Sequence, residues 1–313
     1  MSLPSQPIAR RRRRRQVLRG LIVLGLVGLL AAGSAVWTNA FGVGERFENL
    51  RDRIELALDP PPDRPIRDQV EVTPEPDPTA TPTPGPTQPG TTALPGPTPT
   101  PRPVRRPVDV SILEGDPERY FISQQTKDWC APAGIQMTLA VLGLADTTPA
   151  FQRRLAARVE EWESWQDSHN GGWGPSAIAD ALEAYGAQGY QIRAYGNRTL
   201  ALRDSAAALT RTGKPVILIA WRGAHTWVMT GYRADADPTI FRDALVTGTY
   251  ILDPWYPRIS SIWGPSDPAG TFQDAAEMRR NYLAWKRPEG AYPGRDGKYL
   301  AIVPTIPRQA AAP

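Results

Sequence analysis

One cysteine and two histidines carry most of the nucleophilic and acid–base chemistry available to this chain of 313 residues. The cysteine, Cys130, follows the run QQTKDW (124–129) and opens an apolar segment with helical periodicity. A cysteine at a helix N-terminus has a lowered pKa, because the positive end of the helix dipole stabilises the thiolate. The thiolate is the nucleophilic form, so the segment predicts that Cys130 attacks an acyl carbon.

A cysteine nucleophile needs a base and a group that orients the base. His225 follows a turn and begins a predicted strand, whereas His169 lies in the polar loop DSHNGG, where we expect it to be solvated. Asp253 ends the predicted strand TYILD and is the candidate to orient the imidazole of His225. These residues predict a Cys-His-Asp triad.

Acyl transfer also needs donors for the oxyanion that forms in the transition state. The side-chain amide of Gln124 or of its neighbour Gln125 can supply one. Nine of the ten tryptophans follow residue 108, and we expect Trp129, Trp173 and Trp255, which flank the proposed catalytic segments, to line the substrate cleft. Core packing is the alternative role for these indoles.

Other chemistries lack their residues. One cysteine and two distant histidines form no zinc-ligand pattern, so we expect no metal and no cofactor. The chain has no G-x-x-x-x-G-K-[ST] loop, no G-x-G-x-x-G turn and no G-x-S-x-G elbow, which argues against nucleotide binding and serine hydrolysis. The net charge of +4 arises from +7 in residues 1–19 and −3 elsewhere, so we expect no nucleic-acid surface.

The elements that must position these residues follow from periodicity and from helix start and stop signals. Helices are predicted over residues 130–142, 149–164, 176–185, 200–212 and 271–285. Strands are predicted over residues 190–195, 216–221, 226–232, 246–252 and 299–303. Because VILIAW (216–221) is apolar on both alternating faces, it should be a central strand. Early helices followed by clustered strands indicate an α+β domain with an antiparallel sheet.

Composition divides the chain into five regions. The predicted boundaries are a basic cytoplasmic tail at 1–19, a transmembrane signal-anchor at 20–38, a juxtamembrane helix at 39–59, a Pro/Thr-rich disordered linker at 60–107 and the hydrolase domain at 108–313. The linker holds 17 of the 34 prolines, and as extended polyproline-like chain it would reach on the order of 150 Å.

The charge-free run at 20–37 follows the basic block directly, an arrangement that keeps the N-terminus in the cytoplasm and exports the rest. A signal peptide cleaved after Ala35 or Ala40 is the alternative to a retained anchor. Either way the C-terminal domain is predicted to lie outside the cell membrane.

Four motifs together resemble the papain-like cysteine peptidases, and most closely the bacteriocin-processing, double-glycine-leader group (peptidase C39-like). They are Q-x5-C at Gln124 and Cys130, then APAGIQMTLA, GAHTWVMTGY and ILDPW. The resemblance covers about residues 118–256. It implies a papain-like fold in which an N-terminal helix carries the cysteine and an antiparallel sheet carries the histidine and the aspartate. It also places the oxyanion glutamine six residues before the cysteine, which selects Gln124 over Gln125.

Three features depart from that family. Ala131 stands where the family has glycine, and the 28 residues from His225 to Asp253 form a longer gap than the family's. Bacteriocin-processing members are attached to a transporter ATPase and face the cytoplasm, whereas this chain is predicted to face outward, so leader processing is not carried over.

We therefore expect a bacterial cell-surface cysteine peptidase or amidase that cleaves an amide bond of a peptide, protein or cell-wall peptide through a thioester. A non-catalytic papain-like binding module and a transglutaminase-like acyltransferase are the alternatives.

Overall fold

The computed structural model describes residues 62–74, 103–168, 173–286 and 290–308, together with single helical positions at 25, 28, 30, 33, 34, 54 and 58. The chain divides into two compact units, residues 1–60 and 61–313. The predicted basic tail, signal-anchor and juxtamembrane helix (1–19, 20–38 and 39–59) lie outside the described residues, apart from those single positions. Among the described residues, no helix is both long enough and apolar enough to cross a bilayer.

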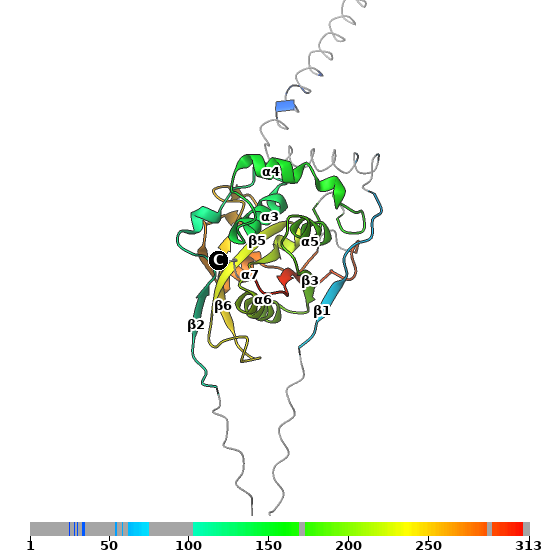
Figure 1. Ribbon diagram of the computed structural model, residues 1–313. Coiled ribbons are helices and arrows are strands. Elements are labelled where there is room, and N and C mark those ends of the chain that lie inside the picture. Colours follow the sequence, from blue (N-terminus) through cyan, green and yellow to red (C-terminus); the bar gives the residue numbers. More distant parts are fainter. Residues whose placement is uncertain are drawn as a thin grey trace, which may run out of the picture. The chain divides into compact units, whose positions relative to one another are not determined.

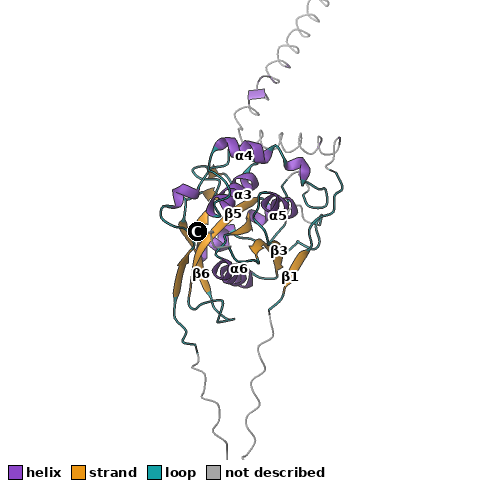
Figure 2. Cartoon of the chain, viewed as in Figure 1, coloured by secondary structure: helices purple, strands orange, loops and turns teal. Residues whose placement is uncertain are grey.

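The second unit is built on one eight-stranded sheet (Figure 2). Its strands are, in spatial order, β1 (Gln69–Val72), β3 (Tyr190–Tyr195), β10 (Tyr299–Pro304), β4 (Val216–Ala220), β5 (His225–Ala234), β6 (Val246–Leu252) and β9 (Thr271–Asp274), with β2 (Val108–Ser111) paired to the far end of β5. The β1–β3 pair is parallel, and the pairs from β3 to β9 are antiparallel. A two-residue pair, β7 (Ile259–Ser260) and β8 (Gly264–Pro265), forms a separate hairpin. The predicted mixed fold with an antiparallel sheet is therefore confirmed.

Helices cover both faces of this sheet (Figure 1). The helices on one face are α3 (Cys130–Val141), α4 (Pro149–Ala156) and α5 (Pro175–Ala184), and those on the other are α6 (Arg198–Thr212) and α7 (Ala275–Asn281). The buried strand β4 separates the two cores: Ile217 and Ile219 pack with α3 and α5, whereas Val216 and Leu218 pack with α6. The prediction that this segment forms a central strand is confirmed, because β10 and β5 flank it.

The helix predicted over residues 271–285 forms only over Ala275–Asn281. Residues Thr271–Asp274 instead form β9, which pairs with β6, and α7 follows over Ala275–Asn281. Asp274 separates the two elements, because its side chain accepts hydrogen bonds from the backbone N–H groups of Ala276 and Glu277. The helix predicted to reach residue 164 ends at Ala156 and continues as a short 3₁₀ turn at Val159–Glu161.

Part of the predicted linker belongs to the fold, which corrects its boundaries. Residues 62–74 and 103–107, placed in the linker by composition, are described, and β1 within the first segment extends the sheet beside β3. Ion pairs join this segment to the domain: Arg67 reaches Asp180 on α5, and Glu71 reaches Lys298. We call residues 62–74 the strap.

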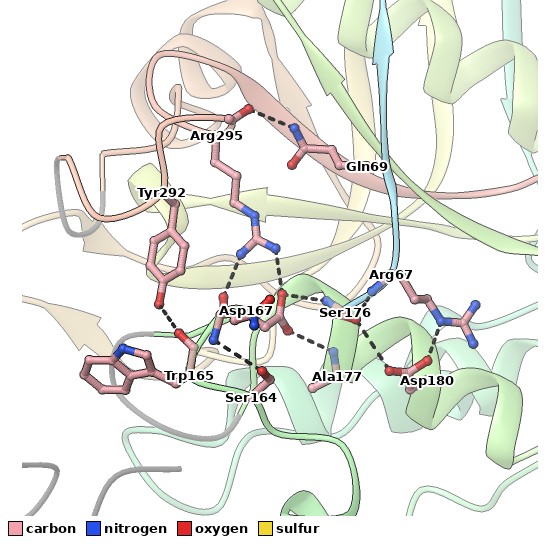
Figure 3. A network of polar contacts seen from close by, with 12 residues as sticks. Arg67, Gln69, Ser164, Trp165, Asp167, Ser176, Ala177, Asp180, Tyr292 and Arg295 are labelled. Carbon is pink, nitrogen blue, oxygen red and sulfur yellow. Dashed lines mark hydrogen bonds and ion pairs between the residues drawn. The ribbon is translucent and has the colours of Figure 1, made fainter. Parts of the chain in front are cut away.

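A buried ion pair lies next to the strap (Figure 3). The guanidinium of Arg295 donates at 2.6 Å to the backbone carbonyl of Asp167 and at 2.7 Å to its carboxylate. The same carboxylate accepts the backbone N–H groups of Ser176 and Ala177, so it caps the start of α5. The hydroxyl of Ser176 accepts in turn from the backbone N–H of Arg67 at 2.7 Å. The strap and the C-terminal segment therefore meet at the N-terminus of α5.

Candidate active site

Helix α3 begins at Cys130, as the sequence predicts. The helix lies close against β5, because Gly134 faces Thr226: a Cβ atom at Gly134 would come within 3.1 Å of the Thr226 hydroxyl. That hydroxyl donates a hydrogen bond of 2.6 Å to the backbone carbonyl of Cys130. The first turn of the helix that carries the thiol is thus fixed to the second residue of the strand that carries His225.

His225 is the first residue of β5, and Asp253 directly follows β6, so the antiparallel pairing of these strands brings the two side chains together. The imidazole Nε2 lies 2.7 Å from Asp253 Oδ1. The carboxylate also accepts the backbone N–H of Trp255 at 2.9 Å, which fixes its orientation. Both residues are buried, at 3% exposure for His225 and 5% for Asp253, so little water competes for this hydrogen bond.

The thiol of Cys130 lies next to the backbone that precedes His225. Its Sγ is 3.9 Å from the carbonyl oxygen of Ala224, and hydrogen bonding and charge from His225 act to lower the pKa of the thiol. Since Nε2 faces the carboxylate, Nδ1 is the ring nitrogen available to the sulfur. His225 thus contacts Asp253 through Nε2, and the sulfur of Cys130 lies beside the residue that precedes His225.

The pKa values of the thiol and the imidazole shift in opposite directions. Burial acts to raise the pKa of Cys130, but hydrogen bonding and charge from His225, followed by hydrogen bonds from Thr226, lower it overall. Burial acts to lower the pKa of His225, but the charge and the hydrogen bond of Asp253, together with Cys130, raise it to about 9. The arrangement favours a thiolate beside an imidazolium, which is the reactive form of a cysteine nucleophile.

The two glutamines before the cysteine point to different partners. The Nε2 atom of Gln124 donates to the backbone carbonyls of Thr126 at 2.7 Å and of Lys127 at 2.9 Å. The side chain of Gln125 instead donates to the carbonyl of Pro149 at the start of α4. Gln124 thus holds the loop that leads into Cys130, and one of its two N–H groups would have to leave a carbonyl to reach an oxyanion.

Ala131, which stands where the family has glycine, directs its methyl group into the apolar core. It is 3% exposed and packs in the cluster formed by α3, α5 and the sheet. The extra methyl group therefore lies among core side chains.

The three predicted cleft tryptophans are divided between two places. Trp255 lies at the site, with its ring edge-on to His225 at a centroid distance of 6.4 Å. Trp129 is the N-cap residue of α3 and adjoins Cys130 in the chain. Trp173 instead contacts Trp162, with ring centroids 5.8 Å apart and planes tilted by 43°, and packs against the core cluster that contains α3 and α5.

Two aromatic residues at the site were not expected from the sequence. The indole of Trp221 stacks on the imidazole of His225, with centroids 3.9 Å apart and planes 17° apart. Trp263 stacks on Trp221 at 5.8 Å with an interplanar angle of 8°. The spacing W-x3-H is the sequence signal for the first contact. Periodicity placed Trp221 in the strand, whereas β4 ends at Ala220 and the indole belongs to the turn that follows.

A comparison with protein-family models gives a match over residues 119–283, to the model described as the Peptidase_C39 like family. The match contains Gln124, Cys130, His225 and Asp253. Neither the curated proteins nor the solved structures contain a match to this chain.

Proposed function

The chain belongs to the Peptidase C39-like family, and from that premise we propose that it is a cysteine peptidase or amidase acting through Cys130, His225 and Asp253. The single observation that carries this proposal is the 2.7 Å contact between His225 Nε2 and Asp253 Oδ1, beside the thiol of Cys130, whose Sγ is 3.9 Å from the carbonyl of the residue before His225. This is the arrangement that nucleophilic catalysis by a thiolate requires.

The proposed reaction has two steps. The thiolate of Cys130 attacks the amide carbon, the imidazolium of His225 protonates the leaving nitrogen, and the C–N bond breaks to give a thioester. Water then attacks the thioester, His225 accepts a proton from that water, and the C–S bond breaks to release the acid and restore the thiolate. Asp253 keeps the imidazole oriented and its charge compensated throughout.

The proposal assigns oxyanion stabilisation to Gln124 and to the N-terminus of α3. The start of a helix presents backbone N–H groups and the positive end of its dipole to a developing negative charge. Gln124 adds a side-chain donor, provided that one of its bonds to Thr126 and Lys127 is exchanged for the substrate oxygen.

We further propose that the domain is held at the outer face of the cell membrane, where peptides, proteins or cell-wall peptides are its substrates. The support is the basic block at 10–15 followed by the charge-free run at 20–37. The full chain should stay with membranes during alkaline carbonate extraction, and a variant lacking residues 1–38 should not. A mature chain that starts just after Ala35 or Ala40 would replace the anchor by a cleaved signal peptide.

The catalytic proposal is tested by alkylating the cysteine. Because Cys130 is the only cysteine in the sequence, alkylation of a thiol can occur at that residue alone. Iodoacetamide at about pH 6 should modify the full chain far faster than an ordinary thiol of pKa near 8.5. Cys130→Ser should abolish both labelling and the hydrolysis of a peptide library. Slow labelling that follows ordinary thiol ionisation would reject the proposal in favour of a binding module. Transfer of a labelled amine to a glutamine peptide, in place of hydrolysis, would reject it in favour of an acyltransferase.

A further inference from the structure

Trp221 stacks directly on the imidazole of His225. The centroids are 3.9 Å apart and the two rings are nearly parallel. Asp253 contacts the imidazole at its edge, through Nε2, and the ring of Trp255 approaches edge-on at a centroid distance of 6.4 Å. Trp221 therefore covers a face of the ring, whereas the carboxylate of Asp253 contacts its Nε2 atom.

The backbone around this indole adopts an unusual conformation to put it there. Trp221 has φ = 50° and Arg222 has φ = 61°, in the left-handed region that bulky side chains rarely adopt. Gly223 completes the turn at φ = 98°, where a Cβ atom would collide with the ring of Trp285. Backbone strain of this kind is typical of functional sites, where the surrounding structure maintains it.

Polar and aromatic contacts hold the indole on the imidazole. Its Nε1–H donates to the side-chain carbonyl of Asn281 at the end of α7, at 3.0 Å. Trp263 stacks parallel to Trp221, and Trp255 meets it edge-on at 5.9 Å. The plane of the Trp221 ring is thus set by three residues outside its own turn, which are Asn281, Trp255 and Trp263.

We propose that Trp221 is a positioning residue that fixes the ring plane of His225 and favours the protonated form of the imidazole through its π face. The inference rests on the proposed function, because it assigns a task within the same site. An aromatic face attracts a cation, indole more strongly than a benzene ring, and the attraction increases when water is excluded, as it is around the buried His225.

Other charges near the imidazole act together with this contact. Cys130 on α3 and Asp253 after β6 interact with the ring directly. Arg258 lies 5.5 Å over the ring of Trp255, one aromatic residue away. Glu277 on α7 accepts from Asn281, which holds the indole. A change at Trp221 leaves all four charged groups in place, so its effect can be separated from theirs.

The chain has two histidines, so the ring protons of His225 can be followed by NMR in the full chain. The variant His169→Gln removes the second signal and assigns the first. In Trp221→Leu, the pKa of His225 should fall by about 0.5 to 1.5 units relative to wild type. Trp221→Phe, which retains a weaker π face, should show a smaller fall. The control is Trp227→Leu, which removes a buried indole from β5, the strand that begins at His225, and leaves the stacked rings in place.

An unchanged pKa of His225 in Trp221→Leu would overturn the inference. If that variant does not fold, Trp221→Phe decides, because a pKa equal to that of wild type would overturn the inference equally. A wild-type His225 that titrates at or below the ordinary histidine value would count against the proposed function instead. Even then, a pKa of His225 that is lower in Trp221→Leu than in wild type would support the role of the stacked indole.

Discussion

The hydroxyl of Thr226 donates a 2.6 Å hydrogen bond to the backbone carbonyl of Cys130. Strand β5 thus supplies the candidate base at its first residue and, at its second, the contact that holds the nucleophile's helix. The two residues that do this, His225 and Thr226, are adjacent in the chain. The position of the sulfur relative to the imidazole therefore depends on one short stretch of backbone.

Replacing Thr226 by valine keeps its shape and removes the hydroxyl. Because hydrogen bonds from Thr226 help His225 to lower the pKa of the Cys130 thiol against the effect of burial, that pKa should rise by about 0.5 to 1 unit in Thr226→Val. The measurement is the pH dependence of iodoacetamide labelling. Thr226→Ser retains the hydroxyl and should show the labelling profile of wild type. If Thr226→Val also labels with the wild-type pH dependence, the hydroxyl does not influence the pKa of the thiol.

The pH dependence of peptide hydrolysis should follow the two opposite shifts. The thiolate appears as pH rises through the lowered pKa of Cys130, and the imidazolium disappears as pH rises through about 9. Activity should therefore increase at a pH below the ordinary thiol pKa, stay level, and fall near pH 9. A profile that only begins to rise above pH 8 would mean that the thiol is not activated.

Gln124 and Gln125 offer a matched pair of substitutions. If Gln124 stabilises the oxyanion, Gln124→Ala should reduce kcat by about 10²- to 10³-fold, because an oxyanion donor acts in the transition state. Gln125→Ala should leave kcat near wild type, since its side chain contacts Pro149 and Arg153. Iodoacetamide labelling serves as a control for the loop, because a displaced Cys130 would also lose reactivity. Equal kcat values for the two variants would remove Gln124 from the mechanism.

The ion pair of Arg295 with Asp167 should contribute strongly to stability. Arg295→Met leaves the carboxylate of Asp167 buried without its guanidinium, which should reduce the free energy of unfolding by about 3 to 5 kcal/mol. Arg280→Ala breaks an exposed ion pair with Glu277 and should change the free energy of unfolding by less than about 0.5 kcal/mol. Urea denaturation of the full chain measures both values. Similar midpoints for the two variants would show that the buried pair is dispensable.

The strap should stay bound after the chain is cut behind it. With a specific protease site inserted between residues 75 and 102, the cleaved pieces should co-elute in native size-exclusion chromatography and separate in urea. β1 and the pairs Arg67–Asp180 and Lys298–Glu71 hold them together. Loss of the N-terminal piece under native conditions would disprove the strap's attachment.

Elements with strong local signals were predicted well from the sequence. Helix α6 begins after Asn197, whose side chain accepts the N–H of Leu200, and ends at Gly213 with φ = 66°. These are the residues that start and stop helices in general. Cys130 at the start of α3 and β4 at the centre of the sheet were also predicted, because apolar periodicity carries that information.

Features that depend on distant partners were missed. β1 is four residues of mixed polarity, QVEV, and its partner β3 lies more than a hundred residues away in the chain. The stack of Trp221 on His225 depends on a left-handed turn that no local propensity favours for tryptophan. The roles assigned to Cys130, Gln124, His225 and Asp253 remain predictions that the experiments above test.

The strap also determines how the domain responds to mechanical force. Both ends of the Pro-rich segment adjoin paired strands, β1 before it and β2 after it. In a chain anchored through its N-terminus, as we propose, tension arriving from residues before 62 would reach β1 and its ion pairs first. The strength of one short parallel strand pair would then set the force at which the strap leaves the domain.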